Sequence, residues 1–282
     1  MAERSGSGGV RYIEVEEGYF EQRGLRHAPR LELDRRVAAV PAADQQAEGQ
    51  HFVRRLAAQF GIQARAQADA ALARCGLVVW AVKPQTFRDA AAPVRAHAAG
   101  ALHLSVAAGI RSDSIAQWLG SERIVRSMPN TPALVGKGMA ALFARPAVSA
   151  ADRTLVEQVI GTTGEHLWVQ AEEQLDAVTA LSGSGPAYVF FFLEAMTAAG
   201  LEMGLAREQA HRLAVGTFVG ASELARASTE PPEVLRGRVT SKGGTTYAAI
   251  TSLQADGVDR LFVKALQAAR RRATELGDEF GA

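Results

Sequence analysis

The sequence predicts an α/β protein in which a domain built on a parallel sheet is followed by an all-helical domain. Three observations indicate this fold class. Residues 77–82 (LVVWAV) form a continuous apolar run, which is typical of a parallel strand buried on both faces. Strand and helix patterns alternate from about residue 53 to 170, as in a sheet with right-handed crossovers. After residue 171 only helical patterns remain.

The first half contains the elements of the predicted sheet. Residues 1–52 are polar and irregular, and Val10–Val15 is their only strand-like piece. A helix is expected to end at Arg54–Phe60, before Gly61. Further strands are expected at residues 77–82, 101–106, 123–127, 139–143 and 165–169. Helices are expected at residues 86–98, 112–119 and 149–160, the second starting at a capping Ser112 and the third at a Ser149–Asp152 capping box.

The second half is expected to hold six helices, at residues 175–181, 186–200, 207–227, 232–239, 246–254 and 258–276. We place the domain boundary near residue 170, which gives domains of residues 1–170 and 171–282. Gly216 and Gly220 lie four residues apart on one helix and would allow close approach of helix backbones. Contact with another chain and packing within this chain explain the pair about equally well.

Composition limits the function. Of 282 residues, 48% are apolar, and 31 Lys and Arg balance 30 Asp and Glu, so no global charge attracts nucleic acid or an anionic membrane. No apolar run is long enough to span a membrane, and residues 1–30 lack a secretory signal; a cytosolic protein is expected. Cys75 is the single cysteine, which excludes an intramolecular disulfide and a cysteine-rich metal site. We expect it to be a small core residue, and we expect no bound metal.

The hexapeptide Ser241–Thr246 (SKGGTT) lies between two predicted helices. Its paired glycines let the backbone turn tightly and expose N–H groups, and Thr245 or Thr246 is expected to cap the following helix. Free N–H groups at a helix start, with the helix dipole, form a site for a carboxylate or a phosphate. On this hexapeptide alone, an ordinary connection between helices is the stronger interpretation.

Three consecutive predicted strands end in small, glycine or proline residues, at Ala81–Pro84, Ser105–Gly109 and Met128–Pro132. Ligands of open α/β sheets bind beyond the carboxyl ends of the strands, so these turns predict the edge of a crevice. Lys83 is equally compatible with a phosphate contact and with a solvated side chain. A further glycine-serine turn at Leu181–Tyr188 is typical of a helix start, with Pro186 near the first helical position.

Five segments occur in a specific order: AVKPQ (81–85), SVAAGI (105–110), RSMPNTPALVGKGM (126–139), LDAVTALSGSGPAYVF (175–190) and VTSKGGTTYAAI (239–250). Together they resemble the pyrroline-5-carboxylate reductase family. The likeness covers roughly residues 54–279 without a large gap. One of these motifs alone would be weak, whereas the ordered set is highly specific.

The resemblance implies a Rossmann-type nucleotide-binding domain followed by an all-helical dimerisation domain that interlocks with a partner chain; dimers often assemble further. It implies an oxidoreductase that transfers hydride from NADPH or NADH to C5 of the cyclic imine 1-pyrroline-5-carboxylate and yields L-proline. Positioning matters more in such chemistry than strong acids or bases. We therefore expect the following histidines to be structural or surface residues: His51, His97, His103, His166 and His211.

The resemblance also implies site residues. The segment matching Val239–Thr246 binds the substrate carboxylate in the family, and Thr246 is placed to hydrogen-bond the ring nitrogen as the catalytic residue. The substrate-binding residues are Val239, Ser241, Gly243, Gly244, Thr245 and Thr246. The residues implied along the nicotinamide end of the cofactor are Ala81, Val82, Lys83, Pro84, Ala107, Ala108 and Gly109.

The N-terminal stretch departs from the family, which begins with an apolar strand leading into G-x-G-x-x-G/A, the seat of the cofactor diphosphate. Here Gly6 and Gly8 precede the strand-like residues, and Arg11 stands where a small residue is needed. Three explanations are open: a reading-frame error or altered start, which we favour; a catalytically impaired dimerising homologue that has lost the site; or an unfamiliar phosphate site. Disorder of residues 1–52 also remains open. A β-hydroxyacid dehydrogenase is disfavoured, because residues 175–200 contain no lysine.

Overall fold

The computed structural model describes residues 12–15, 36–41, 58, 63–65 and 68–281. The chain divides into two compact units, each described by itself below. The sheet unit comprises Met1–Gly183 and Arg270–Ala282, and the helical unit comprises Ser184–Ala269. The predicted domain boundary near residue 170 stays a prediction, because a compact unit need not coincide with a domain that folds alone.

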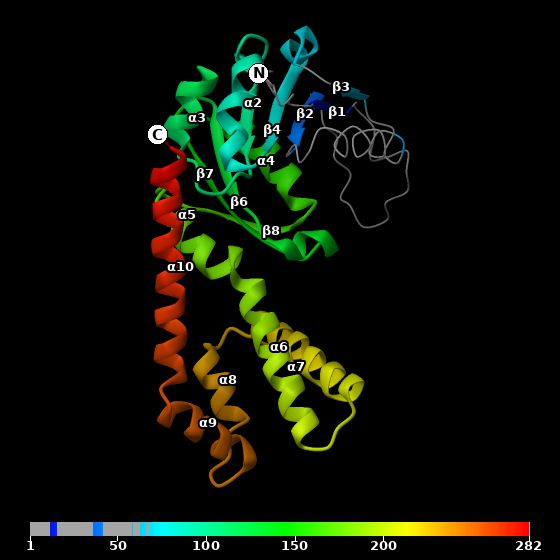
Figure 1. The fold of residues 1–282 in the computed structure, drawn as a ribbon, viewed down its shortest axis with the longest axis vertical. Coiled ribbons are helices and arrows are strands. Elements are labelled where there is room, and N and C mark those ends of the chain that lie inside the picture. The colour runs from blue at the N-terminus through cyan, green and yellow to red at the C-terminus, as the bar shows by residue number, and fades with distance from the viewer. Residues whose placement is uncertain (1–11, 16–35, 42–57, 59–62, 66–67, 282) are drawn as a thin grey trace, which may run out of the picture. The chain divides into compact units, whose positions relative to one another are not determined.

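The sheet unit is built on an eight-stranded sheet with the order β3-β1-β2-β4-β5-β6-β7-β8 (Figure 1). The strands are β1 (Tyr12–Val15), β2 (Arg36–Pro41), β3 (Gln63–Arg65), β4 (Cys75–Ala81), β5 (Leu102–Ser105), β6 (Ile124–Met128), β7 (Gly138–Ala144) and β8 (Gly164–Trp168). Four neighbouring pairs are parallel, namely β2–β4, β4–β5, β5–β6 and β7–β8. The predicted α/β class, with a parallel-dominated sheet followed by helices, is confirmed.

Two features of the predicted sheet need correction. The strands β2 and β3 were not predicted, although β1 falls inside the expected segment Val10–Val15. The sheet is also not parallel throughout, because β6 pairs antiparallel with β7. Only a short 3₁₀ turn, η3 (Thr131–Val135), separates these two strands, and a link without a crossover helix reverses the chain direction. The helix end predicted at Arg54–Phe60 lies outside the described residues.

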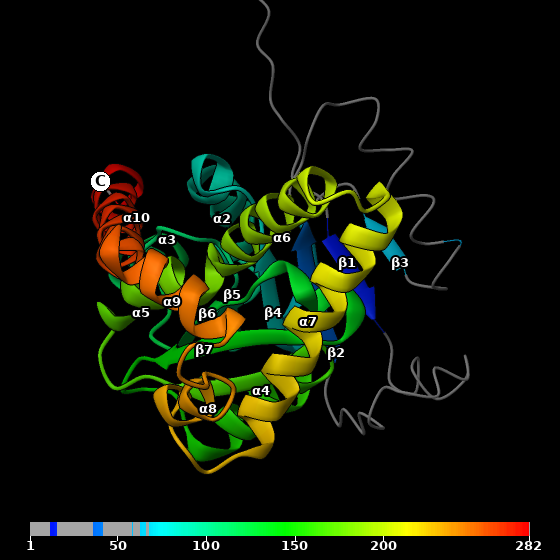
Figure 2. The same cartoon turned by 90° about the horizontal axis from the view of Figure 1, so that it is seen from below.

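Helices cover both faces of the sheet, with α2 (Phe87–Arg95) and α3 (Ser112–Leu119) on one side and α4 (Ala150–Gly161) on the other (Figure 2). Successive side chains of β4 point to opposite faces. Val78 and Trp80 therefore pack in one core cluster with α2 and α3, whereas Leu77 packs in a second cluster with Val156 and Ile160 of α4. The run LVVWAV is apolar because both of its faces are buried.

Helix starts in this unit follow two different rules. The predicted capping box of α4 is confirmed, since Ser149 and Asp152 each accept a hydrogen bond from the other's backbone N–H. The predicted capping role of Ser112 is wrong, because Arg111 is the N-cap residue of α3. The Ser112 N–H instead donates to the Glu172 carboxylate at 2.6 Å. The predicted burial of Cys75 is confirmed.

The remaining helices are α5 (Gln174–Val178), α6 (Gly185–Glu202), α7 (Arg207–Ala227), α8 (Pro232–Arg238), α9 (Thr245–Ala255) and α10 (Val258–Phe280). In the helical unit, α6 and α7 lie side by side (Figure 1). They come close because Gly200 leaves no side chain in the way; a Cβ there would lie 2.6 Å from the Ala210 Cβ. Phe262 packs on Tyr188 and Phe192 of α6, with ring centroids 5.7 and 5.8 Å apart. No helix in the described part of the chain is long and apolar enough to cross a membrane.

His103 is a fully buried polar residue at the centre of β5, and its expected structural role is confirmed. The Trp80 indole N–H donates to its Nδ1 at 3.1 Å, so the neutral ring carries its proton on Nε2. Burial lowers the pKa of His103 from 6.5 to about 4, and the charge of Arg123 also lowers it.

This shift predicts a pH-dependent stability. Below about pH 6.5 the histidine binds a proton in the unfolded chain, whereas His103 in the folded chain stays neutral down to about pH 4. The unfolding free energy should therefore fall with falling pH across that window, by on the order of 3 kcal/mol. Tryptophan fluorescence during urea unfolding measures it in the sheet unit, because Trp80, Trp118 and Trp168 all lie there.

His103→Asn, which keeps an acceptor for Trp80, should flatten this dependence between pH 6.5 and 4. His211→Asn, at an exposed histidine of α7, is the matched control and should keep it. An unchanged slope in His103→Asn would show that another group is responsible.

Candidate active site

The carboxyl ends of β4 and β5 lie level at one edge of the sheet unit. Trp80 pairs with Ser105, and the Val106 N–H donates to the Trp80 carbonyl at 3.0 Å. The predicted cofactor segments Ala81–Pro84 and Ala107–Gly109 therefore leave the sheet side by side. Val82 and Ala107 are buried and Lys83 is exposed, while Ala81, Pro84, Ala108 and Gly109 are half-buried. This edge offers a flat ring a surface of small side chains.

The turn after β5 owes its small residues partly to packing within the protein. Gly109 has a φ of +74°, which favours glycine. A Cβ on this residue would also lie 3.2 Å from the Cβ of Leu276 on α10. The Ala107 N–H donates to the Ser105 hydroxyl at 3.3 Å. Glycine is required here by the backbone and by α10, whatever binds on the outer side.

The structure joins two motifs that the sequence offered separately. Asn130, in the turn after β6, donates from Nδ2 to the Ser182 carbonyl at 3.1 Å and accepts from the Met139 N–H at 2.9 Å. Ser182 lies in η4 (Thr179–Gly183), a π-helical turn between α5 and α6. A Cβ on Gly183 would lie 2.5 Å from the Met128 Cε. Asn130 and Met128 therefore hold the π-helical turn η4 in place just before the helical unit begins. Such π-helical turns are frequent at functional sites.

The predicted substrate segment lies in the helical unit, at the start of α9. Gly243 has a φ of +75°, and the Gly244 N–H donates to the Ser241 carbonyl at 3.0 Å. A Cβ on Gly244 would lie 2.7 Å from the Ser241 hydroxyl. Gly243 is favoured by its backbone conformation, and a side chain on Gly244 would crowd Ser241. Val239, Ser241, Gly243 and Thr245 are exposed, and Thr246 is half-buried.

The predicted threonine cap of α9 is wrong. Gly244 is the N-cap residue, Thr245 is the first helical residue, and no side chain caps the helix. An α-helix leaves its first N–H groups without intrahelical partners. In the absence of a side-chain cap, these groups remain available to an anion. The predicted carboxylate site at this helix start stays a prediction.

Sequence reasoning missed a charged cluster beneath the sheet edge. Arg126, buried in β6, pairs with Glu172 at 2.6 Å, and Glu172 also accepts from the Ser112 N–H and hydroxyl at 2.6 and 2.7 Å. Arg111 binds Asp176 of α5 through two hydrogen bonds of 3.3 and 3.0 Å. The only signal in the sequence was an arginine inside an apolar strand. Such a residue needs a partner, but the sequence does not name it.

The two arginines of this cluster differ in their surroundings. Burial lowers the pKa of Arg126, although the charge and the hydrogen bond of Glu172 oppose this effect. Burial also acts to lower the pKa of Arg111, but the hydrogen bond and charge of Asp176 outweigh it, so the pKa is raised. Both guanidinium groups stay charged, and both are fixed by carboxylates near α5.

The described residues at this edge include no glycine-rich turn of the kind that holds a cofactor diphosphate. In doubly wound sheets the strand beside β4 leads into the glycine-rich turn that holds a diphosphate. Here that neighbour is β2, whose last residue Pro41 pairs with Ala81. Proline has no N–H to donate, and the sequence continues Ala42-Ala43-Asp44 without a glycine. Strand β1 pairs antiparallel with β2, so it does not take the part of the first parallel strand either.

The described residues form no group of three or more His, Cys, Asp and Glu side chains that could hold a metal ion.

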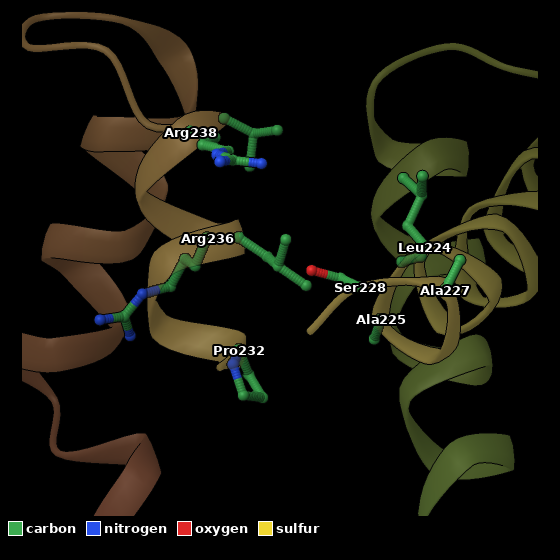
Figure 3. A pocket seen from close by; sticks show the side chains of 10 residues that line it. Leu224, Ala225, Ala227, Ser228, Pro232, Arg236 and Arg238 are labelled. Carbon is green, nitrogen blue, oxygen red and sulfur yellow. The ribbon is translucent and has the colours of Figure 1, made fainter. Parts of the chain in front are cut away.

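The helical unit exposes many large apolar side chains, among them Phe190, Phe191, Leu213, Val219, Leu224 and Leu261. It also contains a cavity of about 660 Å³ between the end of α7 and α8. Figure 3 shows Leu224 and Ala227 on one side and Pro232 on the other, with the Arg236 guanidinium directed away. Surfaces of this kind mark protein contacts.

Comparisons with known proteins agree with this geometry. Residues 172–276 match a family model described as pyrroline-5-carboxylate reductase dimerisation. A pyrroline-5-carboxylate reductase of Pseudomonas aeruginosa is 44% identical over 252 residues, covering 87% of this chain and 92% of that relative. The solved pyrroline-5-carboxylate reductase of Coxiella burnetii has a TM-score of 0.75 at 35% identity, over 83% of this chain and 86% of that one. The Plasmodium falciparum pyrroline carboxylate reductase, solved with NADP bound, has a TM-score of 0.68 at 30% identity, over 73% and 79%.

Asn130→Asp tests the link between the two motifs. The change removes the donor to the Ser182 carbonyl and places a carboxylate oxygen against it, so the sheet unit should lose about 1–3 kcal/mol of unfolding free energy. The urea midpoint from tryptophan fluorescence measures the loss, with Thr131→Ala at the exposed neighbouring position as control. Equal midpoints for the two variants would contradict this role of Asn130.

Proposed function

This chain belongs to the pyrroline-5-carboxylate reductase family, and on that premise we propose that it reduces 1-pyrroline-5-carboxylate to L-proline with NADPH or NADH. The observation that carries the proposal is the 44% identity to the Pseudomonas aeruginosa reductase over 92% of that protein. The level strand ends and the uncapped start of α9 supply the two chemical features that such a reaction needs, a surface for a flat ring and a seat for a carboxylate.

The substrate carboxylate is assigned to the start of α9. Val239, Ser241, Gly243, Gly244, Thr245 and Thr246 form this segment. Its glycines bring the backbone close to the ligand, and the first N–H groups of α9 donate to the carboxylate oxygens, aided by the helix dipole. The exposed Ser241 hydroxyl adds a donor. A site of this kind fixes the substrate without any titratable side chain.

The nicotinamide end of the cofactor is assigned to Ala81, Val82, Lys83 and Pro84 after β4 and to Ala107, Ala108 and Gly109 after β5. A reduced nicotinamide, when bound, supplies the hydride that C5 of the imine accepts. The small side chains at this edge let the ring lie against the backbone, and the level strand ends hold both turns at one height. The choice between the two nicotinamide cofactors stays open.

Thr246 is the proposed catalytic residue. Its hydroxyl lies in the first turn of α9, one residue from the start of the helix. From there it can hydrogen-bond the ring nitrogen of a substrate whose carboxylate binds the same helix start. The imine accepts hydride most readily when its nitrogen is protonated, and a hydroxyl held there orients it. The protein's main contribution is the placing of two rings face to face.

We further propose that the chain forms a homodimer through its helical unit, that these dimers assemble further, and that the protein lies in the cytoplasm. The match of residues 172–276 to the dimerisation model supports the dimer. Gly216 and Gly220 support it as well, because the position of a Cβ on either residue has no atom of the described residues within 4 Å, which favours contact with another chain over packing within this one. The proposed domains remain residues 1–170 and 171–282.

A second candidate is a catalytically impaired dimerising homologue, which the missing glycine fingerprint favours. The two are separated by NADPH oxidation with pyrroline-5-carboxylate, followed at 340 nm. We expect imine-dependent turnover by the purified chain. Absence of turnover from a folded dimer would favour the impaired homologue.

A restored N-terminus tests why the fingerprint is missing. The variant replaces residues 1–52 with an apolar strand that leads into a G-x-G-x-x-A turn and a helix. We expect the Kd for NADPH to fall about tenfold or more, since a diphosphate gains charge-assisted hydrogen bonds. Titration of nicotinamide fluorescence measures the Kd. An unchanged Kd would rule out a reading-frame error as the cause of a missing site.

Thr246→Val tests the catalytic assignment. Loss of the hydroxyl should lower kcat about a hundredfold, while KM for the imine changes little because the backbone N–H groups still hold the carboxylate. Thr246→Ser keeps the hydroxyl and should retain most of kcat. Equal kcat values in the two variants would remove Thr246 from the mechanism.

A further inference from the structure

We propose that the C-terminal end of α10 positions the turn Ala107–Gly109, and that Asp176 is the positioning residue that connects this helix end to Arg111. The inference rests on the proposed function, since it concerns the turn assigned to the nicotinamide. It adds an element that touches neither cofactor nor substrate. All of the contacts below lie within the sheet unit.

The first contact is steric. The Cβ position of Gly109 lies 3.2 Å from the Leu276 Cβ and 3.4 Å from the Phe280 ring. Phe280 also packs against the core cluster formed by β4, α2 and α3. The last two turns of α10 are therefore the inner support of the turn. The outer side remains for a ligand.

The second contact is an ion pair that connects three segments. Asp176 of α5 accepts both hydrogen bonds from Arg111, which immediately follows the buried residue Ile110. The same carboxylate accepts from the Thr274 hydroxyl of α10 at 2.9 Å. Asp176 therefore fixes the far end of the turn relative to α10.

The space around Arg111 is closely filled. A Cβ on Gly277 of α10 would lie 3.0 Å from the Arg111 Nε. Glycine is an unfavourable residue inside a helix, so its presence here has a steric reason. The Arg111 guanidinium passes α10 at Gly277, which has no side chain in its way, and binds Asp176 there.

A third set of contacts holds the start of α3, where the turn ends. Glu172 accepts from the Ser112 N–H and hydroxyl, and the Ser114 hydroxyl donates to the Gly281 carbonyl at 2.8 Å. The turn is thus fixed at β5 by strand pairing and at α3 by α5 and α10. Between these ends, Ala107 is held by its burial in the core and by its hydrogen bond to Ser105, whereas Ala108 and Gly109 have little or no side chain to pack.

The central test compares two carboxylates that each bind an arginine through two hydrogen bonds. Asp176→Asn weakens the hold on Arg111. Glu279→Gln does the same to the exposed pair with Arg272 on the same helix and is the matched control. Amide hydrogen exchange of residues 106–112, measured without cofactor, should rise about tenfold in Asp176→Asn and stay unchanged in Glu279→Gln.

Kinetics then separate positioning from general stability. In Asp176→Asn, kcat should fall by about tenfold to a hundredfold, while KM for the imine stays near that of the unsubstituted chain, because the substrate segment lies in the helical unit. Gly277→Ala is the second variant. Its added methyl group favours the helix but presses on Arg111, so the urea midpoint should hold or rise while exchange in the turn rises.

The outcomes are distinct. Unchanged exchange at residues 106–112 in both Asp176→Asn and Gly277→Ala would overturn the inference whether or not the chain is active. Raised exchange with an unchanged kcat would overturn it too. Raised exchange in both variants, together with no turnover by the unsubstituted chain, would support the positioning role of α10, and only the proposed function would then fail.

Discussion

The parallel pairing of β4 with β5 is the constraint on which both the core and the candidate site depend. Its register pairs Trp80 with Ser105, so the two strands end at the same level and the turns that follow them form a single edge. The same two strands are buried on both faces, with Leu77 in one core cluster and Trp80 in the other. The turns therefore start from rigid, close-packed elements, as a precise site requires.

The small residues at this sheet edge leave the turn after β5 less ordered, and the charged cluster around Glu172 and Asp176 compensates for this. Small residues at Ala107–Gly109 would let a flat ring approach, but apart from the buried Ala107 they give the turn little side-chain surface to pack, and glycine gains the most freedom when a structure loosens. Much of the order must then come from outside the turn. Glu172 and Asp176 supply it through Ser112 and Arg111, at the expense of burying charges that are stable only as pairs.

The sequence was a good guide where periodicity decides the structure and a poor one where distant residues decide it. The strands β4 to β8 and the helix α7 lie where the apolar patterns predicted, because those patterns record burial. Strand β2 was missed because its Arg36, Pro41 and two alanines resemble a loop. The capping role of Ser112 was wrong because its partner, Glu172, lies sixty residues away. The capping role of Thr245 or Thr246 was wrong because Gly244 takes the N-cap position of α9. The site motifs were visible, whereas their supporting ion pairs were not.

The distribution of binding and chemistry over the chain bears on the missing fingerprint. The groups proposed to orient the rings lie after β4, after β5 and at the start of α9, and the glycine turn contributes to none of them. A diphosphate site far from the reacting atoms adds binding energy, and part of such energy serves to hold the reacting groups in place. The support of the Ala107–Gly109 turn by α10 lessens that need, because it orders the turn before any ligand arrives. A defect confined to the N-terminal segment should then weaken cofactor affinity more than the hydride step itself.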